Sequence, residues 1–196
     1  MTARTFVFPL LVALAAPGCG PEKGLRAFDR TWEVKSGDWH VEGNTLIGRG
    51  GVIMTADEQA DAVIEMDVDT NGSIGDRTIG IGFRQQPREA GFAGEKKGAG
   101  YGFNFTGNRA FNVFRGSDNY WMPVNPAFTS FQPSPALDGI KNHVVIRTVG
   151  KRTDVNVNGV RIMRFEDDTF ARGRISLWVE STASAVRFSN VKIEKP

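Results

Sequence analysis

The sequence predicts an all-β fold, built as a two-sheet antiparallel β-sandwich or jelly roll. Apolar and polar residues alternate along many short runs, which is the period of a strand with one buried face. No run shows a convincing amphipathic-helix period, and glycine, proline and asparagine turn signals separate the runs. Roughly a dozen short strands joined by such turns are typical of sandwiches and barrels.

The chain begins with an export signal. Arg4 gives it a positive start, residues 6–16 are almost entirely apolar, and the small residues 16–18 precede Cys19. A bilayer core of about 30 Å needs about 20 apolar residues in a helix, so this stretch is too short to span it. We therefore expect residues 1–18 to be a signal peptide that is removed.

Cys19 is the only cysteine of the chain and lies where a bacterial lipoprotein signal places its lipid acceptor. The segment resembles a lipobox, with Ala16 at the position where leucine is usual. That resemblance implies lipidation of Cys19 and a tether over residues 19–27. It also implies a membrane-anchored lipoprotein of a bacterial cell envelope, at the outer membrane or the periplasmic face. The alternative is an ordinary secretory signal, which would give a secreted protein.

The composition indicates one domain over residues 28–196, long enough to bury a core. The net charge is +2, and lysines and arginines are spread along the sequence. A nucleic-acid-binding protein would need a basic face, so we expect no nucleic-acid partner. With Cys19 lipidated, the mature domain has no thiol and forms no disulfide.

The first strands are predicted at residues 32–35, 39–41, 45–47 and 52–54. The run at 62–69 is the clearest, because its apolar side chains share one face and its carboxylates the other.

The middle of the chain has predicted strands at residues 78–84, 100–105 and 110–114. Two long segments interrupt this rhythm, at 85–99 and 116–139. Loops of that length in a compact domain are usually functional or mobile.

The C-terminal part alternates strongly. Strands are predicted at 143–149, 153–157, 160–165 and 174–179, with Asn158-Gly159 as a hairpin turn. The last run changes phase after Phe188, which indicates a bulge or bend. The residues predicted to form the core are Ile64, Met66, Val68, Ile81, Phe83, Ile146, Val155, Val157, Ile175, Leu177, Val186 and Phe188.

A series of short motifs runs through the chain. In order they are GDWHVEGNTLIG at 37–48, AVIEMDV at 62–68, GIGFR at 80–84, GYGF at 100–103, NHVVIRTVG at 142–150, VNG at 157–159, GRISL at 173–177 and VRFSNVKI at 186–193. This order resembles the concanavalin A-like lectin/glucanase sandwich, over about residues 28–194 of the chain. Within that fold it is most similar to the 3-keto-disaccharide hydrolase domain family. The resemblance implies a protein that binds or acts on carbohydrate.

The chain departs from that family at three polar positions. Residues 78–80 replace an Asn-Ser-Gly, Gly102 stands where an acidic residue often follows the tyrosine, and Trp178 replaces a glutamine. Arg84 is retained. These lost polar groups put in doubt whether the family's catalytic groups carry over to this chain.

Glu65, Asp67 and Asp69 alternate on one strand and form the weak catalytic candidate. A retaining glycosidase needs two carboxyl groups about 5 Å apart, as nucleophile and acid. The run resembles the E-x-D-x-E signature of glycoside hydrolase family 16, with Asp69 in place of the last glutamate. The alternative is a solvated strand face, which leaves Glu65 and Asp67 without a catalytic role.

Trp178 is the leading binding candidate, because its neighbours in the strand face the core and it should point away from it. An aromatic ring on an outer sheet face can stack against a sugar. The alternative is that the loop at 117–135 folds over Trp178. The candidates expected to share one concave face are Arg84, Asn104, Trp121, Arg147 and Trp178. The alternative for each polar one is a surface or cross-strand pair.

No cofactor is expected. His40 and His143 lack metal-ligand spacing, and calcium at Asp67, Asp69 and Asp76 is a weaker expectation without a supporting loop. Serine-nucleophile and phosphate-loop motifs are also absent from the sequence.

The resulting expectation is a cell-envelope lipoprotein whose sandwich binds carbohydrate or a glycoconjugate. Two alternatives remain: a glycoside-active enzyme resembling the 3-keto-disaccharide hydrolases, and a non-catalytic protein-interaction sandwich. The fold hosts all three, so the arrangement of side chains on the outer faces has to decide.

Overall fold

The computed structural model describes residues 24–72, 74–86, 100–117 and 120–196, without the side chains of 117, 120 and 121. Residues 1–18, expected to be a signal peptide, and Cys19 lie outside the described residues. Within the described ranges, no helix is long and apolar enough to cross a membrane.

The described residues form sixteen strands. The first eight are β1 (Gly24–Ala27), β2 (Arg30–Val34), β3 (Asp38–Glu42), β4 (Thr45–Arg49), β5 (Gly51–Gln59), β6 (Ala62–Asp69), β7 (Thr78–Gln85) and β8 (Gly100–Thr106). The others are β9 (Ala110–Ser117), β10 (Tyr120–Pro123), β11 (Gln132–Pro133), β12 (Lys141–Val149), β13 (Arg152–Val157), β14 (Val160–Glu166), β15 (Gly173–Val179) and β16 (Val186–Glu194).

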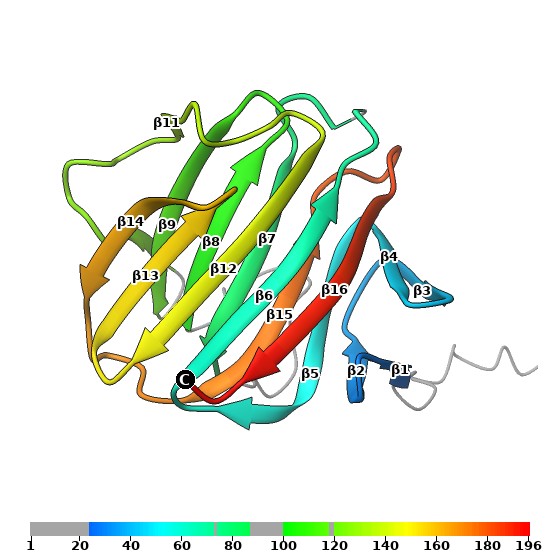
Figure 1. Cartoon of the computed structure of the whole chain (residues 1–196), viewed down its shortest axis with the longest axis horizontal. Helices are drawn as coiled ribbons and strands as arrows, with labels where there is room; N and C mark the ends of the chain where they lie inside the picture. Colours follow the sequence, from blue (N-terminus) through cyan, green and yellow to red (C-terminus); the bar gives the residue numbers. More distant parts are fainter. Residues whose placement is uncertain (1–23, 73, 87–99, 118–119) are drawn as a thin grey trace, which may run out of the picture.

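The strands form two antiparallel sheets that pack face to face (Figure 1). The nine-stranded sheet has the order β1-β2-β5-β15-β7-β8-β9-β10, with β11 added beside β9. The seven-stranded sheet has the order β14-β13-β12-β6-β16-β4-β3. The predicted all-β sandwich is therefore confirmed.

The core lies between the two sheets and consists of the inward-facing half of each strand. All twelve residues predicted for it are buried. Alternation is clearest in β6, where Ile64, Met66 and Val68 are buried and the acidic residues between them are partly exposed. Burial of this apolar surface supplies the main stabilisation of a domain that has no disulfide among its described residues.

The predicted change of phase in the last strand is confirmed. The register of β16 against β6 shifts between Ser189 and Lys192. Asn190 takes a left-handed backbone conformation there, with φ of 52°. A bulge of this kind inserts an extra residue and lets Phe188 and Val191 both face the core.

The structure has strands where the sequence indicated none. β1 pairs with β2, so Gly24–Ala27, which were expected to belong to the tether, are part of the nine-stranded sheet. β10 and β11 both pair with β9 inside the segment expected to be a long loop. Short edge strands such as these have little alternation to reveal them.

Candidate functional site

The outer face of the nine-stranded sheet carries a row of side chains across five neighbouring strands. In register, Val52 of β5 pairs with Trp178 of β15, and Trp178 pairs with Gly80 of β7. Gly80 pairs with Asn104 of β8, which pairs with Asn112 of β9. Directly paired residues point to the same side of a sheet, so this row forms one continuous surface.

Trp178 lies on this surface because its neighbours Leu177 and Val179 face the core. Its indole ring rests over Gly80: a β-carbon at that position would come within 2.8 Å of ring carbon Cε3. The ring is partly exposed, as the alternation of β15 predicts. Gly80 thus provides the space in which the ring lies against the sheet.

A pair of amides flanks the ring. Asn104 donates a hydrogen bond from Nδ2 to Oδ1 of Asn112, at 3.1 Å, and the two residues are only 4% and 1% exposed. Asn104 Oδ1 also lies 2.6 Å from where a β-carbon of Gly80 would be. Asn104 therefore lies beside the ring on the β8 side, Asn112 holds Asn104, and both amides are too buried to present an open binding surface.

A second row beside the first is also built over glycine. Ser176 of β15 pairs with Gly82, and Gly82 pairs with Gly102 of β8. The Ser176 hydroxyl would lie only 2.1 Å from a β-carbon at Gly82. Gln85 folds over the same glycine and donates a hydrogen bond to the Tyr101 carbonyl, at 2.6 Å. The glycines therefore leave space at the centre of this face, and side chains from neighbouring positions lie over them.

Charged groups border this face beyond Ser176. Arg174 donates to Glu33 at 2.6 Å, and Lys35 lies 3.0 Å from the same carboxylate. Burial by itself raises the pKa of Glu33, but hydrogen bonds from Lys35 and Arg174 outweigh it and hold the pKa below its usual range. Glu33 is therefore an ionised acceptor at neutral pH.

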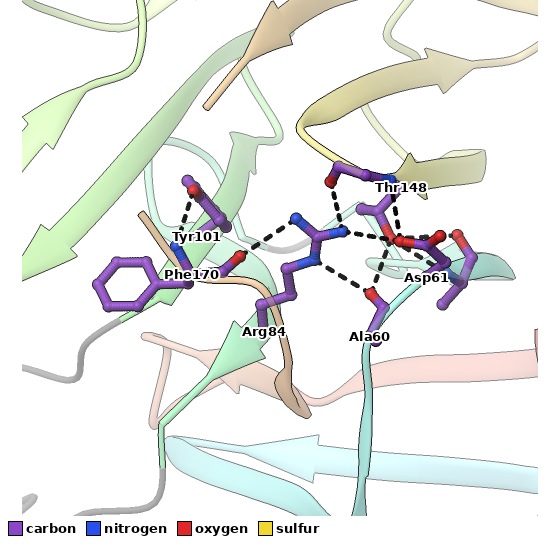
Figure 2. A network of polar contacts seen from close by, with 8 residues as sticks. Ala60, Asp61, Arg84, Tyr101, Thr148 and Phe170 are labelled. Carbon is purple, nitrogen blue, oxygen red and sulfur yellow. Dashed lines mark hydrogen bonds and ion pairs between the residues drawn. The ribbon is translucent and has the colours of Figure 1, made fainter. Parts of the chain in front are cut away.

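Arg84 is not part of this surface. It has a left-handed backbone, with φ of 51°, and its side chain is 3% exposed. Its guanidinium donates to the carbonyls of Ala60, Gly150 and Phe170 at 3.1, 2.8 and 3.1 Å, and to Asp61 at 3.2 Å (Figure 2). Arg84 therefore joins three loops at one end of the sandwich, and its role there is to hold the fold.

The prediction that Arg84 and Arg147 lie on one face with Trp178 is wrong. Arg147 belongs to β12 and is exposed on the outer face of the other sheet. Alternation gives the orientation of a side chain but not the sheet that its strand joins, and the irregular backbone at Arg84 breaks the phase. Of the polar candidates, the structure brings only Asn104 beside Trp178.

Trp121 is described only through its backbone. It lies in β10 and pairs with Gly116 of β9, and β10 is four strands away from β15, which carries Trp178. Its side chain lies outside the described residues, so its place in a binding site stays a prediction.

The carboxylates of β6, Glu65, Asp67 and Asp69, lie on the outer face of the seven-stranded sheet, away from Trp178. Asp67 accepts hydrogen bonds from His143 Nδ1 and Asn190 Nδ2, both at 2.7 Å. The bond from Asn190, opposed by burial and aided by His143, holds the pKa of Asp67 below its usual range. Glu65 lies 3.3 Å from Lys192. Each carboxylate is thus engaged by neighbours within its own sheet, as in a solvated cross-strand ladder.

The carboxylates considered for calcium are not assembled into a metal centre. Asp69 lies 3.4 Å from Lys141 and accepts a hydrogen bond from the Asn71 backbone. Within the described part of the chain, no three acidic, histidine or cysteine residues come together as a group that could hold a metal ion.

Sequence reasoning missed the glycines and Asn112. The signal for the glycines was present: Gly80 and Gly82 alternate in one strand, and Gly100 and Gly102 in the next. Glycine weakens a strand interior and often marks close approach of another group. That Asn112 pairs with Asn104 depends on the register of the β8–β9 hairpin.

Comparisons with known proteins identify the fold. No family model and no curated protein matches the chain. Among solved structures, carbohydrate binding module CBM66 from Bacillus subtilis is similar over 84% of this chain and 95% of that one, with 18% identity and a TM-score of 0.65.

Two further solved structures are similar to this chain over most of its length. A provisionally assigned glycosyl hydrolase from Parabacteroides distasonis has 18% identity and a TM-score of 0.58, over 84% of this chain and 88% of that one. The carbohydrate recognition domain of Emp46p has 11% identity and a TM-score of 0.56, over 83% and 87%. The chain therefore has a concanavalin-like sandwich fold.

Proposed function

We propose that the sandwich binds a carbohydrate or glycoconjugate on the outer face of the nine-stranded sheet, centred on Trp178. The observation that carries the proposal is the partly exposed indole, held against Gly80 in the middle of the sheet. A large aromatic ring in such a position offers its face to the apolar side of a sugar ring. Two structurally similar proteins, CBM66 and the Emp46p domain, are named for binding carbohydrate.

Polar groups beside the ring supply the hydrogen bonds that a sugar needs. Ser176, two residues from Trp178 on the same face, is itself buried, so the partly exposed Arg174–Glu33 pair beyond it offers these donors and acceptors. Ionised donors and acceptors make stronger hydrogen bonds to hydroxyl groups than neutral ones. Asn104 and Asn112 are assigned a positioning role, because Asn104 lies beside the ring, Asn112 holds Asn104, and both are buried.

Glycoside cleavage, the function implied by the resemblance to 3-keto-disaccharide hydrolases, has less support. Its weak candidates Glu65 and Asp67 lie on the opposite outer face from Trp178. The lowered pKa of Asp67, set first by its bond to Asn190, makes it a poor general acid at neutral pH.

The proposal is tested by screening the protein on a glycan array and titrating the best-scoring saccharide by calorimetry. Trp178→Ala is expected to abolish binding and to keep the fold. Phe131→Ala is the matched control, because Phe131 is an exposed aromatic residue in the segment between β10 and β11. Unchanged affinity in Trp178→Ala, with the control also unchanged, would refute the assignment.

The cellular location is part of the same proposal and rests on the sequence around Cys19. Acylation of Cys19 would anchor the protein in the cell envelope, since two or more acyl chains give stable attachment. Cys19→Ser is expected to release the protein or leave it unprocessed. Intact-mass analysis that finds an unlipidated mature chain would contradict the anchor.

A further inference from the structure

Four arginines surround one carboxylate on the outer face of the seven-stranded sheet. Asp154 of β13 lies in the middle, and its side chain is only 9% exposed. Arg152 lies two residues before it on the same strand, and Arg147 of β12 is directly opposite it. Arg161 and Arg164 approach it from β14. The sequence spreads these arginines over three strands, so only the fold reveals the cluster.

A bulge in β14 brings two of the arginines to the same face. Residues three apart in a regular strand point to opposite faces, so Arg161 and Arg164 should diverge. Asn156 pairs with Arg161 while Val155 pairs with Met163, which leaves Ile162 as an extra residue. The extra residue resets the phase, and both guanidinium groups reach Asp154. The backbone is thus shaped to gather positive charge here.

Asp154 holds Arg152 and Arg164 through their inner nitrogens. It accepts from Nε of Arg164 at 2.5 Å and from Nε of Arg152 at 3.1 Å. The bond from Arg164, opposed by burial and aided by Arg152, holds the pKa of Asp154 below its usual range. Among the described residues, the terminal nitrogens of Arg152 and Arg164 make no hydrogen bond. These nitrogens make the planar fork that recognises oxyanions.

The cluster has a surplus of positive charge. One carboxylate balances one of the four arginines, and Glu166, the other acidic residue of β12–β14, pairs with Lys151 at 2.8 Å. Arg147 is exposed and makes no hydrogen bond or ion pair with the described residues. It lines, with Val149, Arg152 and Asp154, a shallow pocket of about 200 Å³.

We propose that this arginine cluster binds phosphate groups of a partner. Asp154 balances the charge of one arginine, and a ligand carboxylate would balance only one more. A phosphate monoester carries about −1.5 to −2 at neutral pH and has three acceptor oxygens, which fits several guanidinium groups with surplus charge. The phosphate can belong to a lipid headgroup or to a soluble phosphate ester. The site is separate from Trp178, which lies on the outer face of the other sheet.

The test uses the whole protein and inorganic pyrophosphate, followed through the arginine Nε–H signals in NMR spectra. The signals of Arg147, Arg152, Arg161 and Arg164 are expected to shift together. Affinity should fall about fivefold for each arginine removed, in Arg147→Gln and in the double variant Arg147→Gln/Arg161→Gln. Arg49→Gln is the matched control, because Arg49 is an exposed arginine of the same sheet outside the cluster.

Vesicles then separate the two sources of phosphate, with every variant carrying the same N-terminus. Tighter binding of the wild type than of the double variant to vesicles that contain phosphatidic acid, a lipid with a phosphate monoester headgroup, competed by pyrophosphate, identifies lipid headgroups. Pyrophosphate binding without any vesicle difference identifies a soluble phosphate ester. Either result supports the site. Unmoved arginine signals, or an equal loss of affinity in Arg49→Gln, would overturn it.

Discussion

The two outer faces of the sandwich are made from opposite kinds of residue. The nine-stranded sheet has glycines at its centre, and an indole and two amides lie over them. The seven-stranded sheet has polar and charged side chains that pair across strands, such as His143 with Asp67 and Asp154 with Arg164. The first face offers an apolar platform and the second offers charge, so one scaffold presents two different chemistries.

This difference shows that an outward-facing side chain does not by itself make a binding site. The residues paired with it on the neighbouring strands also decide what the surface can bind. Trp178 can lie against the sheet because Gly80 is its partner, whereas Arg147 remains available because its partner Asp154 is shared among other arginines. Cross-strand pairing, which the linear sequence does not display, therefore decides the chemistry of each face.

The largest expected effect separates two adjacent residues of β15. Leu177→Ala removes a fully buried side chain and should cost about 2–5 kcal/mol in the free energy of unfolding. Trp178→Ala should cost far less, because it faces outward. Denaturant unfolding of both variants checks this. A larger loss at Trp178 than at Leu177 would mean that the ring is a structural element instead of a platform.

Arg84→Lys should have the second-largest effect. It tests the contacts by which Arg84 joins the three loops that contain Ala60, Gly150 and Phe170. Lysine keeps the charge but cannot donate to three carbonyls in the planar arrangement of a guanidinium. Buried carbonyls left without a donor should lower the free energy of unfolding by about 2 kcal/mol or more. Saccharide affinity should stay unchanged, since Arg84 does not line the face of Trp178. A normal stability in this variant would remove its structural role.

Gly80→Ala sharpens the account of the platform. The added methyl group would meet Trp178 Cε3 at 2.8 Å and Asn104 Oδ1 at 2.6 Å, so the ring must move. We expect a stability loss of about 1 kcal/mol from overpacking, and a much larger loss of saccharide binding. Gly24→Ala is a useful control for affinity, because its added carbon would make only an ordinary contact, 3.5 Å from Thr31 Cγ2. Full binding by Gly80→Ala would show that the ring position is irrelevant.

Asp154→Asn should have the smallest effect on stability, below about 1 kcal/mol, because the arginines around it are largely exposed. The lowered pKa of Asp154 fixes how its contribution to stability depends on pH. The contribution is fully present above the ordinary pKa of 3.8, and it is lost as the pH falls through the pKa of the folded state. The stability difference between wild type and variant should therefore shrink in acid. A difference that grows in acid would contradict this sign.

The sequence was sufficient for much of the fold. Alternation located the two-faced strands, such as residues 62–69, and placed Leu177 inward and Trp178 outward. It also anticipated the bulge after Phe188. These features depend on local period, which a sequence displays directly.

The sequence could not predict which residues come together in each candidate site. Arg147 and Trp178 both alternate outward, yet their strands join different sheets, because sheet membership depends on long-range pairing. The bulge at Ile162 that gathers Arg161 and Arg164 has no turn residue to mark it. Arg84 looks like a surface residue in its strand but is buried by three loops from elsewhere in the chain.

The most direct test of the central claim is an NMR titration that maps where a saccharide binds. With the saccharide that scores best on the array, backbone signals of Gly80, Ser176 and Trp178 should shift, and those of Arg147 and Asp154 should stay in place. Shifts confined to the seven-stranded sheet, or centred on Asp67 and His143, would contradict the assignment of carbohydrate binding to the face of Trp178.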